Sequence, residues 1–342
     1  DLVRSRGLGD VYKRQEYGCA KGGLILKPYI DDGEIVVDYV QSGQFYPVAF
    51  DSKGNITDII FAERKQAGEI TYTRLERHRL AGETCEITNR AYRSLNKSYL
   101  GTETRLSEIE EWAGLEPQAY IRPVERLLVG YFRPALANTV DTTSPLGVSV
   151  YSRAVDLIEE ADRQYSRLLW EFEGGELAVD ADESLFRMDS KTGRIQLPKG
   201  KERLFRALGM DSSQAATKPL EIFAPALRDE SYKRGLDQLL ERIEDACGLA
   251  RGTFSSQTQE ARTATEVKVL KQRSYATVAD NQKALQNALE QLVYAMDVWA
   301  TVGKLAPKGK YDISFEWDDS IIVDPQSEQA IRLQEVASGI LK

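Results

Sequence analysis

The chain has 342 residues, of which 42% are hydrophobic, so it can hold two or three packed domains and is not a wholly disordered protein. It contains no apolar run of about eighteen residues, so the sequence predicts no membrane-spanning helix. The net charge of −8 argues against a protein that clings to nucleic acid through a basic surface, although it does not exclude DNA as a cargo, because tight binding and free sliding need opposite electrostatics.

The cysteines, Cys19, Cys85 and Cys247, are odd in number and far apart in the sequence. This spacing indicates a reducing compartment and predicts no disulfide framework.

Both ends of the sequence are unusual. Residues 1–15, DLVRSRGLGDVYKRQ, lack a persistent apolar period and resemble translated adapter sequence, so we expect a non-native tail that takes no part in the fold. At the other end, Asp324 and Pro325 predict the start of a helix that Gly339 would end, three residues before the chain stops. We therefore expect a fragment that is truncated at both ends.

Residues 21–95 are predicted to be rich in β-strands. Turns rich in Gly, Asp, Ser and Asn separate segments in which apolar and polar residues alternate. This pattern predicts a twisted antiparallel meander with one solvent-exposed face. The alternating segments include 34–40, 56–66, 69–81 and 83–94.

Two further elements follow the meander. Residues 106–114 predict a short helix, and residues 127–134 predict a buried strand. His78, the one histidine of the chain, lies on a strongly charged strand, so we expect it at the surface.

Two amphipathic helices of moderate length come next. Ser149 is the expected N-cap of the first, which covers residues 150–172 and ends at a pair of glycines. The second covers residues 228–247 and ends at Gly248. The residues between the two helices predict short strands and turns.

The longest predicted element is a helix over residues 263–302, which contains no Gly or Pro and would span roughly 60 Å. Thr263 and Glu266 form a capping box at its start, and Gly303 is the expected C′ glycine at its end. Residues at spacings of three and four form one stripe along it. The stripe comprises Val267, Leu270, Ser274, Val278, Asn281, Leu285, Ala288, Leu292, Met296 and Trp299.

The stripe of the long helix changes character along its length. Its first half includes Ser274 and Asn281, whereas its second half is apolar. We therefore expect the second half to pack in a core and the first half to meet a more polar surface. Beyond the helix, residues 310–324 predict strands.

The chain is poor in residues that carry out chemistry. It has no phosphate-binding loop, no dinucleotide fingerprint, no nucleophile elbow and no clustered His or Cys ligands, so we expect no cofactor and no metal. Glu316, Asp318, Asp319 and Asp324 flank an apolar strand, as the ligands of divalent-metal nucleases sometimes do, but a turn followed by a helix N-cap explains them equally well. Two other acidic clusters suit solvated helix faces. They are Glu108, Glu110 and Glu111, and Glu159 and Glu160.

The order of these segments resembles that of the portal proteins of tailed bacteriophages, in particular those of siphophages that infect Gram-positive hosts. The resemblance covers nearly all of residues 20–342 and rests on the succession of blocks, since no single motif is diagnostic. The blocks are GGLILKPYIDDGEIVVDYV, ITYTRLERHR, LGVSVYSRAVDLIEEADRQYSRLLWEFEGG, GTFSSQTQEARTATEV with the long helix after it, and FEWDDSIIVD.

The resemblance implies an α+β protomer with a β-rich wing, two stem helices that flank a small αβ clip, and one long wing helix. The implied divisions are a tail (1–15), the wing (16–148), a wing and stem helix (149–170), the clip (171–226), the returning stem helix (227–247), a tunnel loop (248–262), the long wing helix (263–302), and a wing strand with the truncated start of a crown (303–342).

The resemblance also implies a function. Portal proteins form rings, usually of twelve subunits, at one capsid vertex, and double-stranded DNA passes through them during packaging and ejection. The implied partners are the large terminase subunit, the capsid and scaffolding proteins and a neck protein, with no membrane, in the virion and in the host cytoplasm during assembly. The tunnel loop would present short polar or basic side chains to the DNA. They are Arg251, Thr253, Ser255, Ser256, Gln257, Gln259 and Arg262.

Two other functions stay open from the sequence alone. One is a non-portal structural or adaptor protein that oligomerises through the long helix, although Ser274 and Asn281 weaken a coiled-coil seam. The other is a divalent-metal hydrolase that uses Glu316, Asp318 and Asp319.

Overall fold

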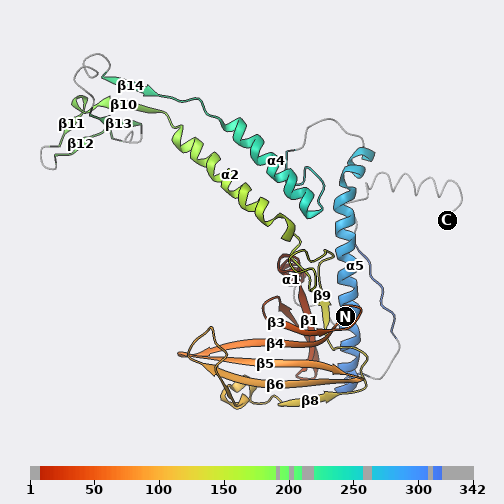
Figure 1. Ribbon diagram of the computed structural model, residues 1–342. Coiled ribbons are helices and arrows are strands. Elements are labelled where there is room, and N and C mark those ends of the chain that lie inside the picture. The colour runs from red at the N-terminus through yellow and green to blue at the C-terminus, as the bar shows by residue number, and fades with distance from the viewer. Residues whose placement is uncertain are drawn as a thin grey trace. The chain divides into compact units, whose positions relative to one another are not determined.

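A computed structural model describes residues 8–189, 193–199, 204–209, 219–256, 264–306 and 311–317 (Figure 1). The chain forms two compact units, each of which mixes helices and strands, as the predicted α+β class requires. The first unit comprises Asp1–Arg153, Cys247–Ala250 and Ala261–Lys342, and the second comprises Ala154–Ala246 and Arg251–Glu260.

The first unit holds two antiparallel sheets and the long helix. Its described elements are α1 (Leu8–Lys21), β1 (Leu24–Asp31), β2 (Glu34–Gln41), β3 (Phe45–Phe50), β4 (Ile56–Ala67), β5 (Ile70–Ala81), β6 (Thr84–Ser94), β7 (Thr102–Thr104), the 3-10 turns Leu106–Glu108 and Glu110–Trp112, β8 (Gln118–Ile121), β9 (Gly130–Phe132) and α5 (Ala264–Val302). One sheet has the order β2–β1–β9. The other has the order β3–β4–β5–β6–β7, with β8 also paired to β6.

The second unit is built on a pair of helices. Its described elements are α2 (Val155–Gly174), β10 (Ala178–Asp182), the 3-10 turn Glu183–Leu185, β11 (Arg187–Met188), β12 (Ile195–Gln196), β13 (Phe205–Leu208), β14 (Leu220–Phe223) and α4 (Asp229–Cys247). Strand β10 pairs with β13 in parallel and with β14 antiparallel. A 3-10 turn, Ser152–Ala154, joins the two units.

The core of the first unit lies on one face of the six-stranded sheet. Ile59 and Phe61 of β4 and Ile87 of β6 pack there with Ile25 of β1 and with Ala295 of α5. The segment predicted as a buried strand also lies in this core. Residues 127–129 are buried and lead directly into β9.

Small residues let α5 lie close to β9. Ala288 and Ala295 of α5 are fully buried, and a Cβ atom on Gly130 would lie 2.3 Å from the carbonyl oxygen of Ala288. Only a glycine fits at position 130 without a shift of one backbone against the other.

The predicted surface position of His78 is wrong. His78 is 3% exposed, and its Nε2 lies 2.6 Å from a carboxylate oxygen of Glu76. Because alternate residues of a strand share one face, Arg74, Glu76 and His78 all point to the core side of β5. There Glu76 also pairs with Lys27 of β1 at 3.0 Å, so the charges of this strand form a buried network instead of a wet face.

Helix α1 covers residues 8–15, which the sequence did not place in any element. The guanidinium of Arg14 lies 4.2 Å from the centre of the Tyr39 ring on β2. Residues 8–15 are therefore part of the fold, while the adapter origin of residues 1–15 stays a prediction.

Three local predictions also differ from the structure. Residues 106–114 form two 3-10 turns instead of an α-helix. Helix α2 starts at Val155, five residues later than predicted: the Ser149 hydroxyl accepts from the N–H of Tyr151, but the 3-10 turn Ser152–Ala154 precedes the helix. Residues 311–317 are not a strand.

Helix α5 ends at Val302, as predicted, but the residue that caps it is Lys304 and not Gly303. Lys304, with φ of 53°, takes the left-handed position, and Leu305 N–H donates to the Ala300 carbonyl at 2.9 Å. This is a Schellman motif in which Lys304 is C′. Gly303 serves packing instead, because a Cβ there would lie 2.4 Å from Cδ1 of Ile30 on β1.

Several predictions fall outside the described residues. They are the cap at Thr263, the loop residues Gln257, Gln259 and Arg262, the carboxylates Asp318, Asp319 and Asp324, and the helix from Pro325. None of the described helices has a stretch long and apolar enough to cross a membrane.

Candidate functional site

The loop that follows α4 contains the candidate residues from the sequence. Gly248, with φ of 72°, ends α4, and its carbonyl accepts from the Thr277 hydroxyl at 2.7 Å. Ala250 N–H donates to Ser274 Oγ at 2.8 Å. The polar first half of the α5 stripe thus binds backbone groups of this loop, which explains why Ser274 interrupts an otherwise apolar face.

Asn281, the other polar residue of the stripe, has the same role elsewhere. Its Oδ1 accepts from Ala135 N–H at 3.2 Å, and its Nδ2 donates to the Thr277 carbonyl at 2.8 Å. The two polar residues of the α5 stripe therefore accept hydrogen bonds from backbone N–H groups of neighbouring loops.

A fully buried carboxylate, Glu244 on α4, organises the next part of the loop. One of its oxygens, Oε1, accepts from the N–H groups of Phe254 and Ser255, the latter at 2.8 Å. The other oxygen, Oε2, accepts from Gly252 N–H at 3.1 Å and from Ser255 Oγ at 2.8 Å. Residues 252–255 are thus wrapped around one acidic side chain.

These hydrogen bonds keep Glu244 ionised. Burial by itself would raise the pKa of the carboxyl, but the donors from Phe254, Ser255 and Gly252 outweigh that effect and hold the pKa below its ordinary value. A buried charge of this kind persists only when its oxygens are satisfied by donors.

Other acidic residues of α4 fasten the rest of the described loop. Arg251 Nη2 lies 2.9 Å from Asp245 and its Nη1 lies 3.7 Å from Glu241. Ser256 N–H donates to Asp237 Oδ1 at 2.6 Å. The loop between residues 251 and 256 is therefore held against the acidic side of its own helix.

The candidate loop residues fall into separate groups. Arg251, Thr253 and Ser256 are exposed. Ser255 is buried, and both its hydroxyl and its N–H bind Glu244, so it shapes the loop. Gln257, Gln259 and Arg262 lie outside the described residues.

Sequence reasoning missed Glu244. The signal was present, because Glu244 follows Leu236 and Leu240 at intervals of four and so continues the apolar face of its helix. An acidic residue on such a face near the end of a helix predicts a bond to the backbone that follows.

A second carboxylate joins the far ends of α2 and α4. Glu171 accepts from the N–H of Arg228, from its Nε at 3.0 Å and from its Nη2 at 2.7 Å. The hydrogen bonds from the Arg228 side chain, followed by the one from its backbone, hold the pKa of Glu171 below its ordinary value. Nearby, Leu227 lies where a Cβ on Gly175 would be, so the helix pair closes tightly at this end.

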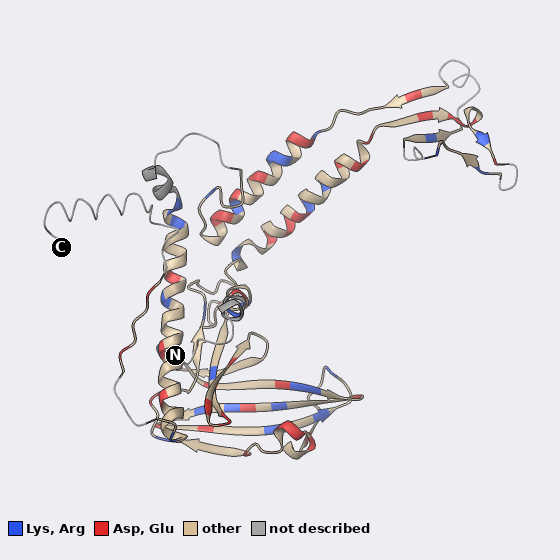
Figure 2. Cartoon of the chain, turned by 180° about the vertical axis from the view of Figure 1, so that it is seen from behind, with Lys and Arg blue, Asp and Glu red and all other residues tan. Residues whose placement is uncertain are grey.

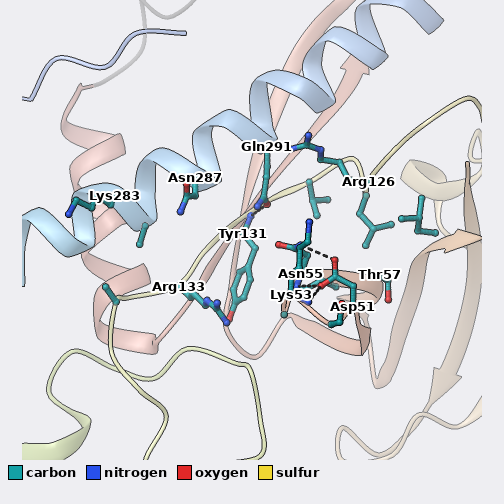
Figure 3. A pocket seen from close by; sticks show the side chains of 18 of the residues that line it. Asp51, Lys53, Asn55, Thr57, Arg126, Tyr131, Arg133, Lys283, Asn287 and Gln291 are labelled. Atoms are coloured by element: carbon teal, nitrogen blue, oxygen red, sulfur yellow. Dashed lines mark hydrogen bonds between the residues drawn. The ribbon is translucent and has the colours of Figure 1, made fainter. Parts of the chain in front are cut away.

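A polar cleft of about 650 Å³ lies in the first unit between the β3–β4 turn, residues 125–135 and α5. Figure 3 shows Lys283, Asn287 and Gln291 of α5 along one side of it and Arg126 and Arg133 on other elements. Its Asp51 carboxylate is used locally, since it accepts from Asn55 and from Lys53 N–H. The lining mixes both charges and is not built around one reactive group.

The hydrolase alternative gains no support from the described residues. Glu316 is exposed, whereas Asp318 and Asp319 are outside the described part of the chain. In that part, no group of three or more His, Cys, Asp or Glu side chains is placed to hold a metal ion.

Burial raises the pKa of the Cys85 thiol to about 11, so this cysteine is unreactive at neutral pH.

Together these features define a class of protein: an α+β structural protein whose helix pair carries a small sheet at one end and a fastened polar loop at the other. A family model described as phage portal protein, SPP1 Gp6-like, matches residues 15–341. The chain therefore belongs to this family of phage portal proteins and has a structural role as a portal. No curated protein matches it.

Proposed function

We propose that this chain is the protomer of a ring that forms a conduit for double-stranded DNA at one vertex of a phage capsid, with no catalysis of its own. The observation that carries the proposal is the family match over residues 15–341, which spans both units. The same match favours a portal over an adaptor protein that would use the long helix alone.

Exposed apolar residues on α2 support assembly into an oligomer. Only Ala161 and Leu168 are buried among its apolar side chains. Leu157 is half-buried, and the other six are between 40% and 68% exposed, which is unusual for a face of a monomeric protein. They are Val155, Ile158, Tyr165, Leu169, Trp170 and Phe172.

The charge of the chain suits a channel that DNA passes without being gripped. DNA carries one charge per about 1.7 Å, so a net charge of −8 on each copy reduces attraction to the phosphates. Brief contacts would come from the exposed loop residues Arg251, Thr253 and Ser256, followed by Gln257, Gln259 and Arg262. Ser255 is no longer in this set, because it is buried.

The assembly implied by this function has defined neighbours. We assign the second unit to the stem helices and clip, and the first to the wing. A ring of twelve copies would meet the large terminase subunit and later a neck protein through the clip, and capsid or scaffolding proteins through the wing. It would assemble in the host cytoplasm and remain in the virion.

Negative-stain electron microscopy of the purified chain, together with its mass in solution, tests the ring. The expected result is a closed ring with a central channel. A folded chain that stays monomeric at all protein concentrations would refute the proposal.

The role of the loop has its own test. Arg251→Gln and Arg262→Gln should change the salt dependence of DNA contact and the rate of packaging, because each removes one charge that reaches the phosphates. Arg163→Gln on α2 is the control, since Arg163 lies outside the loop but, like Arg251, pairs with acidic residues of a helix, here Glu159 and Glu160. Equal behaviour of all three variants would count against a DNA-facing loop.

A further inference from the structure

The six-stranded sheet has a second face, opposite the core, on which Tyr46, Arg79 and Arg90 are exposed. Ile59, Phe61 and His78 point into the core, so the residues beside them in the register point to the other side. We call that side the outer face. It includes Ile60 of β4, Arg77 and Arg79 of β5, and Arg90 of β6.

The outer face has the composition of a protein interface. Its described part carries four arginines and three tyrosines, together with Glu86 and Glu103, and contains no lysine. Arginine and tyrosine are enriched at interface centres, whereas lysine is depleted there. Two of the tyrosines, Tyr46 and Tyr120, are 50% and 61% exposed. The set is Tyr46, Arg64, Arg77, Arg79, Arg90, Tyr92 and Tyr120.

Three of these arginines, Arg64, Arg79 and Arg90, have no hydrogen-bond or ion-pair partner within the described residues. Arg77 donates two hydrogen bonds to the buried Asp58, at 2.9 and 2.5 Å. Glu86, the residue opposite Arg79 in the register, accepts a hydrogen bond from Gln118 at 2.7 Å. Arg79 and Arg90 are exposed and make neither a hydrogen bond nor an ion pair in that part of the chain. Since Arg90 lies opposite Leu75, the two guanidiniums extend from positions about 13 Å apart along the sheet.

The same chain carries a complementary acidic group. The β1–β2 turn contains Asp31, Asp32 and Glu34, all of which are exposed and none of which makes a side-chain hydrogen bond or an ion pair with a described residue. Asp32 and Gly33 have φ of 48° and 78°, as in a type I′ turn, so the carboxylates are presented from a rigid hairpin end.

These two features cannot neutralise each other within one copy. Strands β1 and β2 place Ile25 and Val40 in the core with Ile59 and Phe61. The hairpin thus packs on the core side of the sheet, and the sheet itself separates its strands from the outer face.

We propose that the acidic turn of one copy docks on the outer face of the next, with Asp31 and Glu34 against Arg79 and Arg90. Two different surfaces of the same chain then meet, and repetition of such a head-to-tail contact closes a ring. Hydrogen bonds between carboxylates and guanidiniums fix the orientation of such a contact and also attract the two surfaces to each other. The inference rests on the proposed ring and names one contact that joins its neighbours.

The outer face favours protein over DNA as the occupant. It also carries the carboxylates of Asp58, Glu86 and Glu103, which a phosphate backbone would meet at close range. A protein surface with few, well-placed carboxylates avoids that repulsion, because it can contact Arg79 and Arg90 alone.

The test is a charge swap in the full chain. Arg79→Glu with Arg90→Glu, and separately Asp31→Lys with Glu34→Lys, should each weaken self-association about tenfold or more, and the four changes combined should restore it. Asp32 is left unchanged because its positive φ disfavours lysine. Lys97→Glu, at an exposed site that belongs to neither set of residues, is the control and should assemble normally.

Mass photometry measures the association, and oxidative footprinting of Tyr46 and Tyr120 reports whether the outer face is covered in the assembled wild type. Protection of both tyrosines and recovery in the swap support the inference. A wild-type ring with both tyrosines reactive, or unaltered assembly of the Arg79→Glu, Arg90→Glu variant, overturns the inference and leaves the ring intact. A wild type that forms no oligomer overturns the proposed function as well.

Discussion

Ser255 donates its hydroxyl to one carboxylate oxygen of Glu244 and its N–H to the other, each at 2.8 Å. A loop residue is thereby fixed to a helix eleven positions earlier in the chain. The described part of the loop after α4 is therefore shaped by α4 itself. If that loop meets DNA, the contact starts from a fixed support.

Glu244→Gln should loosen this support. The amide keeps the size of the carboxylate, but it replaces an acceptor oxygen with a donor that faces N–H groups. Because hydrogen bonds to a charged group contribute roughly 1.5–3 kcal/mol, the amides of Gly252, Phe254 and Ser255 should exchange with solvent ten- to a hundredfold faster. Hydrogen–deuterium exchange measures this directly.

Glu241→Gln is the matched control, because Glu241 lies one turn away and only approaches Arg251, at 3.7 Å. Exchange at Phe254 and Ser255 should stay at the wild-type rate in that variant. Equal effects of the two substitutions would show that Glu244 does not organise the loop.

Glu76 should make the stability of the first unit depend on acidic pH. Burial would raise its pKa, but the bond to His78 and the charges of His78, Lys27 and Arg74 lower it well below 4.5. A lowered folded-state pKa stabilises the fold above the unfolded-state pKa, and this contribution is lost as the pH falls below about 4.5 toward the folded-state value.

The measurement compares the free energy of unfolding of wild type and Glu76→Gln from neutral pH downward. The wild type should be more stable at pH 7, and the difference should shrink below pH about 4.5. A difference that stays constant through this range would mean that the charge of Glu76 does not matter to the network.

The sequence predicted best what depends on one repeating pattern. Helix α5 was placed to within one residue, because its apolar stripe, its start signal and a nearby glycine all agreed. The antiparallel meander was likewise predicted from alternation and from turns such as Asp31–Glu34. These signals are local, so they need no knowledge of what packs on top.

The predictions that were wrong concern features set by contacts with residues that are distant in the sequence. Nothing in a charged strand says which face meets the core, so the burial of His78 beside Glu76 could not be read from alternation alone. Ser149 has the composition of a helix cap, but its hydroxyl binds two residues on, and α2 starts at Val155. At the candidate site, the sequence named the loop but not Glu244, which holds it.

Gly130→Ala should destabilise the first unit by roughly 1–3 kcal/mol, since the added Cβ would lie 2.3 Å from the Ala288 carbonyl and force β9 and α5 apart. Gly114→Ala is the control, because no atom lies within 4 Å of the added carbon. Denaturant unfolding should separate the two variants. Equal unfolding midpoints for the two variants would show that the space between β9 and α5 can hold the added Cβ.

Lys304→Gly should stabilise the end of α5. Lys304 has φ of 53°, which costs a residue with a Cβ about 1 kcal/mol or more, whereas glycine takes this conformation freely. The glycine that the sequence offers, Gly303, is one position too early and is kept there by Ile30. Allowing for the greater chain entropy of unfolded glycine, the gain should be about 0.5–1 kcal/mol. Lys304→Ala removes the same charge but keeps the Cβ, so it should give no gain. If both variants unfold at the same denaturant concentration, the benefit comes from the lost charge and the left-handed C′ position is not the cause.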